Sequence, residues 1–93
     1  MEFDWDDAKA DSNERKHGVS FTEATTVFGD VLSVTGYDPR HADVEDRFIT
    51  MSTSVEGRLI LVAHTDRGDS IRIISARKAT SRERKAYEDG NFP

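Results

Sequence analysis

The hydrophobic positions of this chain change from a helical spacing in its first third to an alternating spacing in most of the rest. Ala24, Val27 and Phe28 recur three or four residues apart, which is the spacing of one helix face. From about residue 47 onward, apolar and β-branched residues instead alternate with polar ones or form short runs, as in Arg58–Thr65. The pattern predicts helices first and a sheet afterwards.

Residues that favour helix ends set the expected limits of three helices. Asp4 or Asp6 can cap a first helix, and Gly18, which suits a left-handed C-cap, is expected to end it. The capping-box spacing of Ser20–Glu23 predicts a second helix that continues to about Phe28. Thr80–Glu83 repeats this spacing and predicts a closing helix.

The strands are separated by short segments rich in glycine and charged residues. The connections 54–57 and 66–69 are short and contain glycine, so they predict antiparallel hairpins. A longer turn-rich segment, 36–43, contains Asp38-Pro39 as its strongest break. Strands are expected over Val31–Thr35, Arg47–Thr53, Arg58–Thr65 and Ser70–Arg77, and Met1–Asp4 can add an edge strand.

These elements predict one α+β domain over residues 1–93. It has two N-terminal helices, an antiparallel sheet of about four strands and a C-terminal helix, with the helices against one face of the sheet. Apolar residues make up only 35% of the chain, which is low for a globular domain. We therefore expect a partner or self-association to contribute to stability.

Composition excludes several classes of protein. The chain has no cysteine, which excludes disulfides and cysteine nucleophiles and is typical of a reducing compartment. The longest apolar run, Leu59–Ala63, is too short to span a membrane, and the acidic N-terminus does not resemble a signal peptide. We expect a cytoplasmic protein with no membrane contact. No metal-ligand spacing or glycine-rich phosphate loop is present, so we expect neither a metal nor another cofactor.

Positive charge is concentrated in residues 67–85, although the chain has a net charge of −5. This segment contains seven basic residues and two acidic ones, so it is a candidate site for a polyanion such as RNA. Lys78 stands at the junction of a strand and a helix, where it can project towards a ligand. Arg82, Arg84 and Lys85 can equally serve as a solvated helix face. The candidate RNA-binding residues are Arg47, Arg67, Lys78, Arg82, Arg84 and Lys85.

His64, Arg72 and Arg77 are the candidate catalytic residues. Imidazole transfers protons near neutral pH, and guanidinium groups stabilise charge on phosphorus without a metal. If these groups converge on one phosphate, they could promote cleavage of RNA, in which the RNA's own 2′-hydroxyl attacks the adjacent phosphate. We expect His64 and Arg72 to face the same way near the hairpin end, whereas strict alternation places Arg77 on the opposite face from Arg72. The alternative for His64 is a hydrogen-bonded core histidine.

Three stretches of the chain, taken in order, resemble the BrnT family of bacterial toxins. They are FDWDDAKADSNERKHGVSFTEATTVF, EDRFITMSTSVEGRLILVAHTDRGDSIRIISARKAT and SRERKAYEDG, and the resemblance extends from Met1 to about Gly90. It implies a RelE-like fold and a ribonuclease toxin of a type II toxin–antitoxin pair, which cuts RNA without a metal and inhibits translation and growth. Arg77 matches the family pattern, so the resemblance also implies phosphate binding by this residue.

The resemblance implies a partner as well. Family members are neutralised by a BrnA-like antitoxin whose DNA-binding part is of the ribbon-helix-helix kind. The toxin would then form a hetero-oligomer and contact operator DNA only through the antitoxin. The alternative from another class is a non-catalytic protein-binding module that acts as part of a repressor complex, which would also explain the acidic composition.

Overall fold

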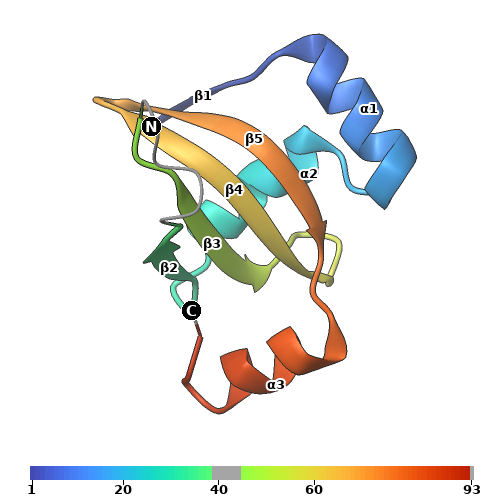
Figure 1. Ribbon diagram of the computed structural model, residues 1–93, viewed down its shortest axis with the longest axis vertical. Helices are drawn as coiled ribbons and strands as arrows, with labels where there is room; N and C mark the ends of the chain where they lie inside the picture. Colours follow the sequence, from blue (N-terminus) through green and yellow to red (C-terminus); the bar gives the residue numbers. More distant parts are fainter. Residues whose placement is uncertain (39–44, 93) are drawn as a thin grey trace.

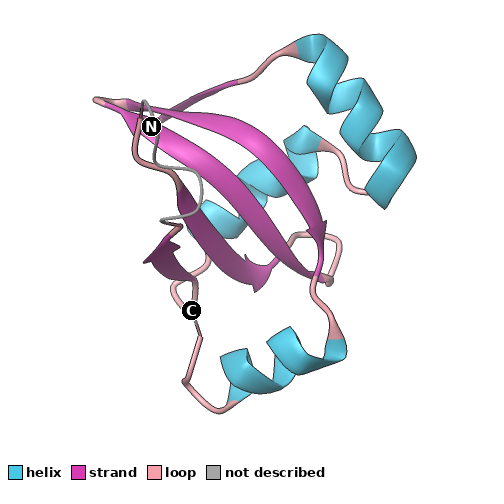
Figure 2. Cartoon of the chain, viewed as in Figure 1, coloured by secondary structure: helices cyan, strands magenta, loops and turns pink. Residues whose placement is uncertain are grey.

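The computed structural model describes residues 1–38 and 45–92, and these form an α+β fold with three helices and a five-stranded mixed sheet (Figures 1 and 2). The strand order is β1-β5-β4-β3-β2, with β1 parallel to β5 and the other neighbours antiparallel. The elements are β1 (Glu2–Asp4), α1 (Asp7–His17), α2 (Phe21–Thr25), a 3₁₀ turn (Thr26–Gly29), β2 (Val34–Tyr37), β3 (Phe48–Thr53), β4 (Leu59–Arg67), β5 (Ser70–Lys78) and α3 (Ser81–Glu88).

The α+β prediction is confirmed in outline and corrected in detail. The sheet has five strands instead of about four, and it is mixed because the short β1 runs parallel to β5. The second helix ends at Thr25, earlier than predicted, and continues as a 3₁₀ turn. Thr25 and Thr26 donate their hydroxyls to the carbonyls of Thr22 and Glu23, each at 2.7 Å, and such local bonds compete with a regular helix. Residues 39–43 of the predicted turn lie outside the described part.

The predicted helix caps are present. The hydroxyl of Ser20 accepts from the backbone N–H of Glu23 at 3.0 Å, and Thr80 and Glu83 form a complete capping box. Gly18 ends α1 with φ of 71°, a conformation that glycine adopts without a steric penalty. Local sequence therefore determines where these helices begin and where α1 ends.

The helices lie on both faces of the sheet, and not on one as expected. On the first face, called here the α1/α2 face, a core of nine buried residues joins the helical segment to β4 and β5. On the opposite face, called here the α3 face, Met51, Leu59 and Leu61 are buried beneath Ala79, Tyr87 and Phe92. Because β4 carries apolar side chains on both faces, each face needs a cover. None of the helices in the described part is long and apolar enough to cross a membrane.

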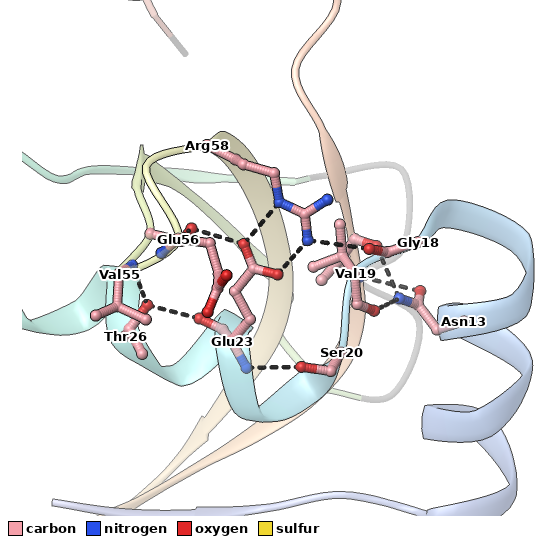
Figure 3. A network of polar contacts seen from close by, with 11 residues as sticks. Asn13, Gly18, Val19, Ser20, Glu23, Thr26, Val55, Glu56 and Arg58 are labelled. Atoms are coloured by element: carbon pink, nitrogen blue, oxygen red, sulfur yellow. Dashed lines mark hydrogen bonds and ion pairs between the residues drawn. The ribbon is translucent and has the colours of Figure 1, made fainter.

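A buried polar network fixes the corner between α1 and α2 against the sheet (Figure 3). Asn13 donates to the carbonyls of Val19 and Ala76, at 3.0 and 2.8 Å, and accepts from the N–H of Ala76 at 3.1 Å. Nearby, Arg58 binds the carboxylate of Glu23, and this hydrogen bond is the main reason that the pKa of Glu23 is lowered. Asn13 thus ties α1 to the stretch of β5 that follows Ile74.

Candidate active site

A β-bulge in β5 decides which side chains share the α3 face. In the pairing of β4 with β5, His64 lies opposite Ile73, whereas Ala63 lies opposite Ser75. Ile74 is therefore an extra residue in β5, and the alternation of side chains shifts by one position after it. Bulges of this kind often re-aim a side chain next to a functional site.

The bulge brings Arg72 and Arg77 to the same face. Ile73 and Ala76 both belong to the core on the α1/α2 face, so Arg72, before the bulge, and Arg77, after it, both point to the α3 face. The prediction that strict alternation separates these two arginines is wrong. An inserted residue that no sequence pattern marked is the physical reason.

A pocket of about 150 Å³ lies on this face, with guanidinium groups at its border. Ala63 and Ser75 are cross-strand partners with small side chains, so the sheet surface is hollow where they meet. Arg47 precedes β3 and borders the pocket on one side, and Arg77 borders it from β5. The lining residues are Asp38, Arg47, Ile49, Leu61, Ala63, Ser75 and Arg77.

Arg77 is held in place by Glu83 at the start of α3. Its Nη1 and Nη2 donate to the two carboxylate oxygens of Glu83 at 2.7 and 2.8 Å. The backbone N–H of Thr80 donates to the same carboxylate at 2.9 Å, as part of the capping box. The hydrogen bond from Arg77 is the main reason that the pKa of Glu83 falls to about 2. A planar bidentate contact of this type is also how arginine binds phosphate.

Two more predicted arginines lie on the α3 face beyond the pocket, and each has a carboxylate partner. Arg67 binds Glu45 through two hydrogen bonds of 2.9 Å, and Arg72 binds Asp4 at 3.0 Å. The pKa of Glu45 is lowered chiefly by Arg67, with smaller contributions from Arg72 and Arg47. The three arginines are therefore neighbours in space. The guanidinium group of Arg47 makes no hydrogen bond or ion pair with any other residue that the structure describes.

The remaining predicted RNA-binding residues lie outside the pocket. Lys78 ends β5 opposite Ile60, on the α1/α2 side of the strand. Arg82, Arg84 and Lys85 are exposed on α3, where Lys85 forms an ion pair with Asp89 at 3.2 Å. Within the described residues, none of these four basic side chains lines the pocket. The structure thus brings together the strand arginines and leaves the helix cations at the periphery.

His64 points away from all of these arginines. Its ring is only 2% exposed on the α1/α2 face, between Phe28 and Phe48. Nε2 lies 2.8 Å from the hydroxyl of Thr50, and Nδ1 lies 2.9 Å from a carboxylate oxygen of Asp66. Burial is the main cause of its lowered pKa.

The expectation that His64 faces Arg72 is wrong, because the register pairs Arg72 with Thr65 and places the histidine opposite Ile73. The observed arrangement matches the alternative of a hydrogen-bonded core histidine. Catalysis by His64 therefore stays a prediction that the geometry does not support.

Asp38 and Ser75 line the pocket but were not among the predicted site residues. Asp38 is 4% exposed, and its backbone N–H donates to the carbonyl of Arg47 at 2.8 Å. The face of Asp38 follows from the observed extent of β2, which continues to Tyr37, whereas the sequence predicted a turn from residue 36. The face of Ser75 depends on the bulge, so the sequence offered no signal for this residue either. No group of three or more histidine, aspartate or glutamate side chains suited to a metal occurs among residues 1–38 and 45–92.

A comparison with known protein families matches the part of the chain that contains the pocket. A family model described as the ribonuclease toxin BrnT of type II toxin–antitoxin systems matches residues 5–83. The chain belongs to the BrnT family. This match confirms the resemblance noted from the sequence. A type II toxin–antitoxin system also implies that the toxin has a protein antitoxin as its partner. The matched region includes every residue that lines the pocket, and also Glu83.

A solved structure supports the BrnT fold. The crystal structure of the Brucella abortus ribonuclease toxin BrnT has a TM-score of 0.64 with this chain at 24% sequence identity. The similarity covers 87% of this chain and 99% of that one, so the two BrnT domains have nearly the same extent. A search of curated protein sequences finds no match.

Proposed function

We propose that this BrnT-family toxin cleaves RNA in the pocket between Arg47 and Arg77, by attack of a 2′-hydroxyl on the adjacent phosphate. One observation carries the proposal: two arginines, one just before β3 and one on β5, line the same pocket on the sheet. The family description supports the ribonuclease activity, and the geometry supports the position. The scissile phosphate would lie over Ala63 and Ser75.

The reaction places negative charge where the arginines stand. As the 2′-oxygen bonds to phosphorus, the bond to the 5′-oxygen breaks, leaving a 2′,3′-cyclic phosphate and a 5′-hydroxyl. Charge builds on the phosphate oxygens, and Arg47 and Arg77 would stabilise it in place of a metal ion. A guanidinium has five N–H donors, so the contacts of Arg77 with Glu83 leave others for the phosphate.

Asp38 supplies the carboxylate of the pocket. It is buried and adjoins Arg47 across the β2–β3 pair, so its oxygens lie on the face where the 2′-hydroxyl would be. We assign it the role of general base, which accepts the 2′-hydroxyl proton, while a water protonates the leaving 5′-oxygen. Arg72 and Arg67 would bind the flanking RNA backbone, in competition with Asp4 and Glu45. Looser contacts would come from Lys78, Arg82, Arg84 and Lys85.

The cellular role follows from the family. RNA cleavage would stop translation and growth in the cytoplasm, and a BrnA-like ribbon-helix-helix antitoxin would neutralise the toxin in a hetero-oligomer. The toxin would then contact operator DNA only through the antitoxin. Binding of the antitoxin over the pocket on the α3 face would be the simplest way to block cleavage.

The test uses purified Arg77→Ala and Arg47→Ala with a labelled RNA in the presence of EDTA. We expect wild-type protein to release 2′,3′-cyclic phosphate ends, and each variant to cleave about a hundredfold more slowly. Arg15→Ala, on the exposed surface of α1, is the control for loss of one positive charge, and Glu83→Gln is the control for loss of the Arg77–Glu83 contact.

Cleavage by both pocket variants within about threefold of wild type would reject this site. Wild-type protein that binds its antitoxin but never cleaves RNA would favour the non-catalytic module instead. Urea unfolding curves of each variant separate a catalytic defect from an unfolded chain.

A further inference from the structure

Lys9 and Lys16 of helix α1 share the side beside β5, whereas Arg15 lies with the acidic residues on another side. At about 100° per residue, Asn13 and Lys16 lie within about 40° of Lys9 around the helix axis. Asp7, Asp11 and Glu14 lie about 140° to 160° away from Lys9. Asn13 is hydrogen-bonded to Ala76 of β5, beside which α1 lies (Figure 1). The helical spacing therefore places the two lysines on the side of α1 that is turned to β5.

A second pocket, of about 210 Å³, lies between this side of α1 and β5. Every titratable side chain that lines it is basic, in a chain whose net charge is −5. Neither of its lysines forms an ion pair with another described residue, whereas Arg58, Arg67, Arg72 and Arg77 each have a carboxylate partner. The lining residues are Lys9, Ser12, Asn13, Lys16, His17, Ile74 and Ser75.

The two pockets meet at the bulge. Ser75 lines both of them, with the Arg47–Arg77 pocket on the α3 face and the lysine pocket at the edge towards α1. Ile74, the extra residue of the bulge, lines only the second pocket. Because the two pockets share Ser75, a chain that left the first pocket across this residue would approach Lys9 and Lys16.

We infer that a single-stranded RNA continues from the cleavage pocket across Ser75 onto α1, where Lys9 and Lys16 bind the phosphates that flank the cut. This inference rests on the proposed function and extends it, because it defines a second subsite and requires a substrate longer than the scissile step. A basic groove that follows the backbone is how proteins hold single strands without reading their sequence. The lysines bind RNA away from the reacting atoms, so they should affect KM and leave kcat unchanged.

The test compares adjacent residues of one helix. Lys16→Ala and Arg15→Ala each remove one positive charge from α1, but only Lys16 lines the pocket. The probes are fluorescent 2′-O-methyl RNAs of three and ten nucleotides, which cannot react through a 2′-hydroxyl. Binding is measured over a range of salt concentrations for wild type, both single variants and Lys9→Ala/Lys16→Ala.

We expect the double variant to bind the ten-nucleotide RNA about tenfold more weakly and the trinucleotide as wild type does. Its slope of log affinity against log salt should fall by about 1.4, because each phosphate contact on a single strand contributes about 0.7. Arg15→Ala should retain the wild-type slope. Equal losses in Lys16→Ala and Arg15→Ala, or no loss in the double variant, would overturn the inference.

The readout distinguishes the two proposals from each other. Cleavage that depends on Arg77, together with normal binding by the double variant, would reject the lysine subsite alone. A wild-type protein that binds neither RNA would reject the cleavage site and the subsite together. If the double variant loses antitoxin binding and keeps RNA binding, the lysine pocket is a protein contact and this inference is wrong.

Discussion

Asn13 makes the strongest single prediction about stability, because one side chain satisfies three buried backbone groups. Its amide contacts the carbonyls of Val19 and Ala76 and the N–H of Ala76, at 2.8 to 3.1 Å. Val19 and Ala76 are both 0% exposed, so water reaches them poorly once the amide is gone. Replacing Asn13 with Ala would remove all three contacts.

Each buried polar group left without a partner costs about 1 to 3 kcal/mol. Asn13 itself is 9% exposed, so one water can enter from its side and lower the total. We expect the free energy of unfolding to fall by about 3 to 5 kcal/mol. A domain of this size has about 5 to 14 kcal/mol in all, so the change removes about a fifth or more of its stability.

The assay is urea unfolding followed by circular dichroism, with wild type, Asn13→Ala and Asn13→Asp. The aspartate keeps an acceptor for the N–H of Ala76 but puts a carboxylate against two carbonyls, so it should be at least as destabilising. Ser12→Ala, exposed on the same helix, is the control and should change stability by less than about 0.5 kcal/mol.

A loss below about 1 kcal/mol in Asn13→Ala would refute this reasoning. Alanine is a better helix former than asparagine, so helix propensity works against the expected loss. Such a result would mean that water replaces the amide fully, and that α1 is held to β5 by its apolar contacts alone.

Two further predictions concern pH. The pKa of Glu83 is lowered to about 2, so its charged form stabilises the fold above pH 4.5 and that stabilisation is lost as the pH falls towards 2. Glu83→Gln should therefore be less stable than wild type in urea at pH 7 and converge with it near pH 2; a constant gap would contradict the assignment. Burial lowers the pKa of His64, so protons favour the unfolded chain and wild-type stability should decrease as the pH falls below 6.5. His64→Gln should lack this decrease and still cleave RNA, and a folded His64→Gln without cleavage would return the histidine to the mechanism.

Local interactions explain what could be predicted for the helices and hairpins. Ser20 with Glu23 and Thr80 with Glu83 are three residues apart, so their contacts depend on one helical turn and can be recognised in the sequence. The same holds for Gly18, whose left-handed conformation ends α1. The family could also be recognised, because it rests on ordered motifs and not on the register of the sheet.

The candidate site depended on contacts that are distant in the sequence. The apolar alternation of β4 and β5 fixes two faces but not an inserted residue, and Ile74 reverses the face of everything after it. Without the bulge, Arg77 would lie on the core side, away from Arg72. The positive charge of residues 67–85 could therefore be derived from the sequence, but the faces of the sheet on which its side chains lie could not.

The sequence by itself determined the helix caps, the hairpins, the basic C-terminal third and the BrnT family, because each is encoded by neighbouring residues or by ordered motifs. Only the tertiary structure decided that β1 joins β5 in parallel, that α3 covers the second face, and that His64 is buried away from the arginines. It also decided that Asp38, Arg47 and Arg77 line one pocket. The physical reason is that a strand offers two equivalent faces, and only pairing with its neighbours, including one bulge, assigns each side chain to one of them.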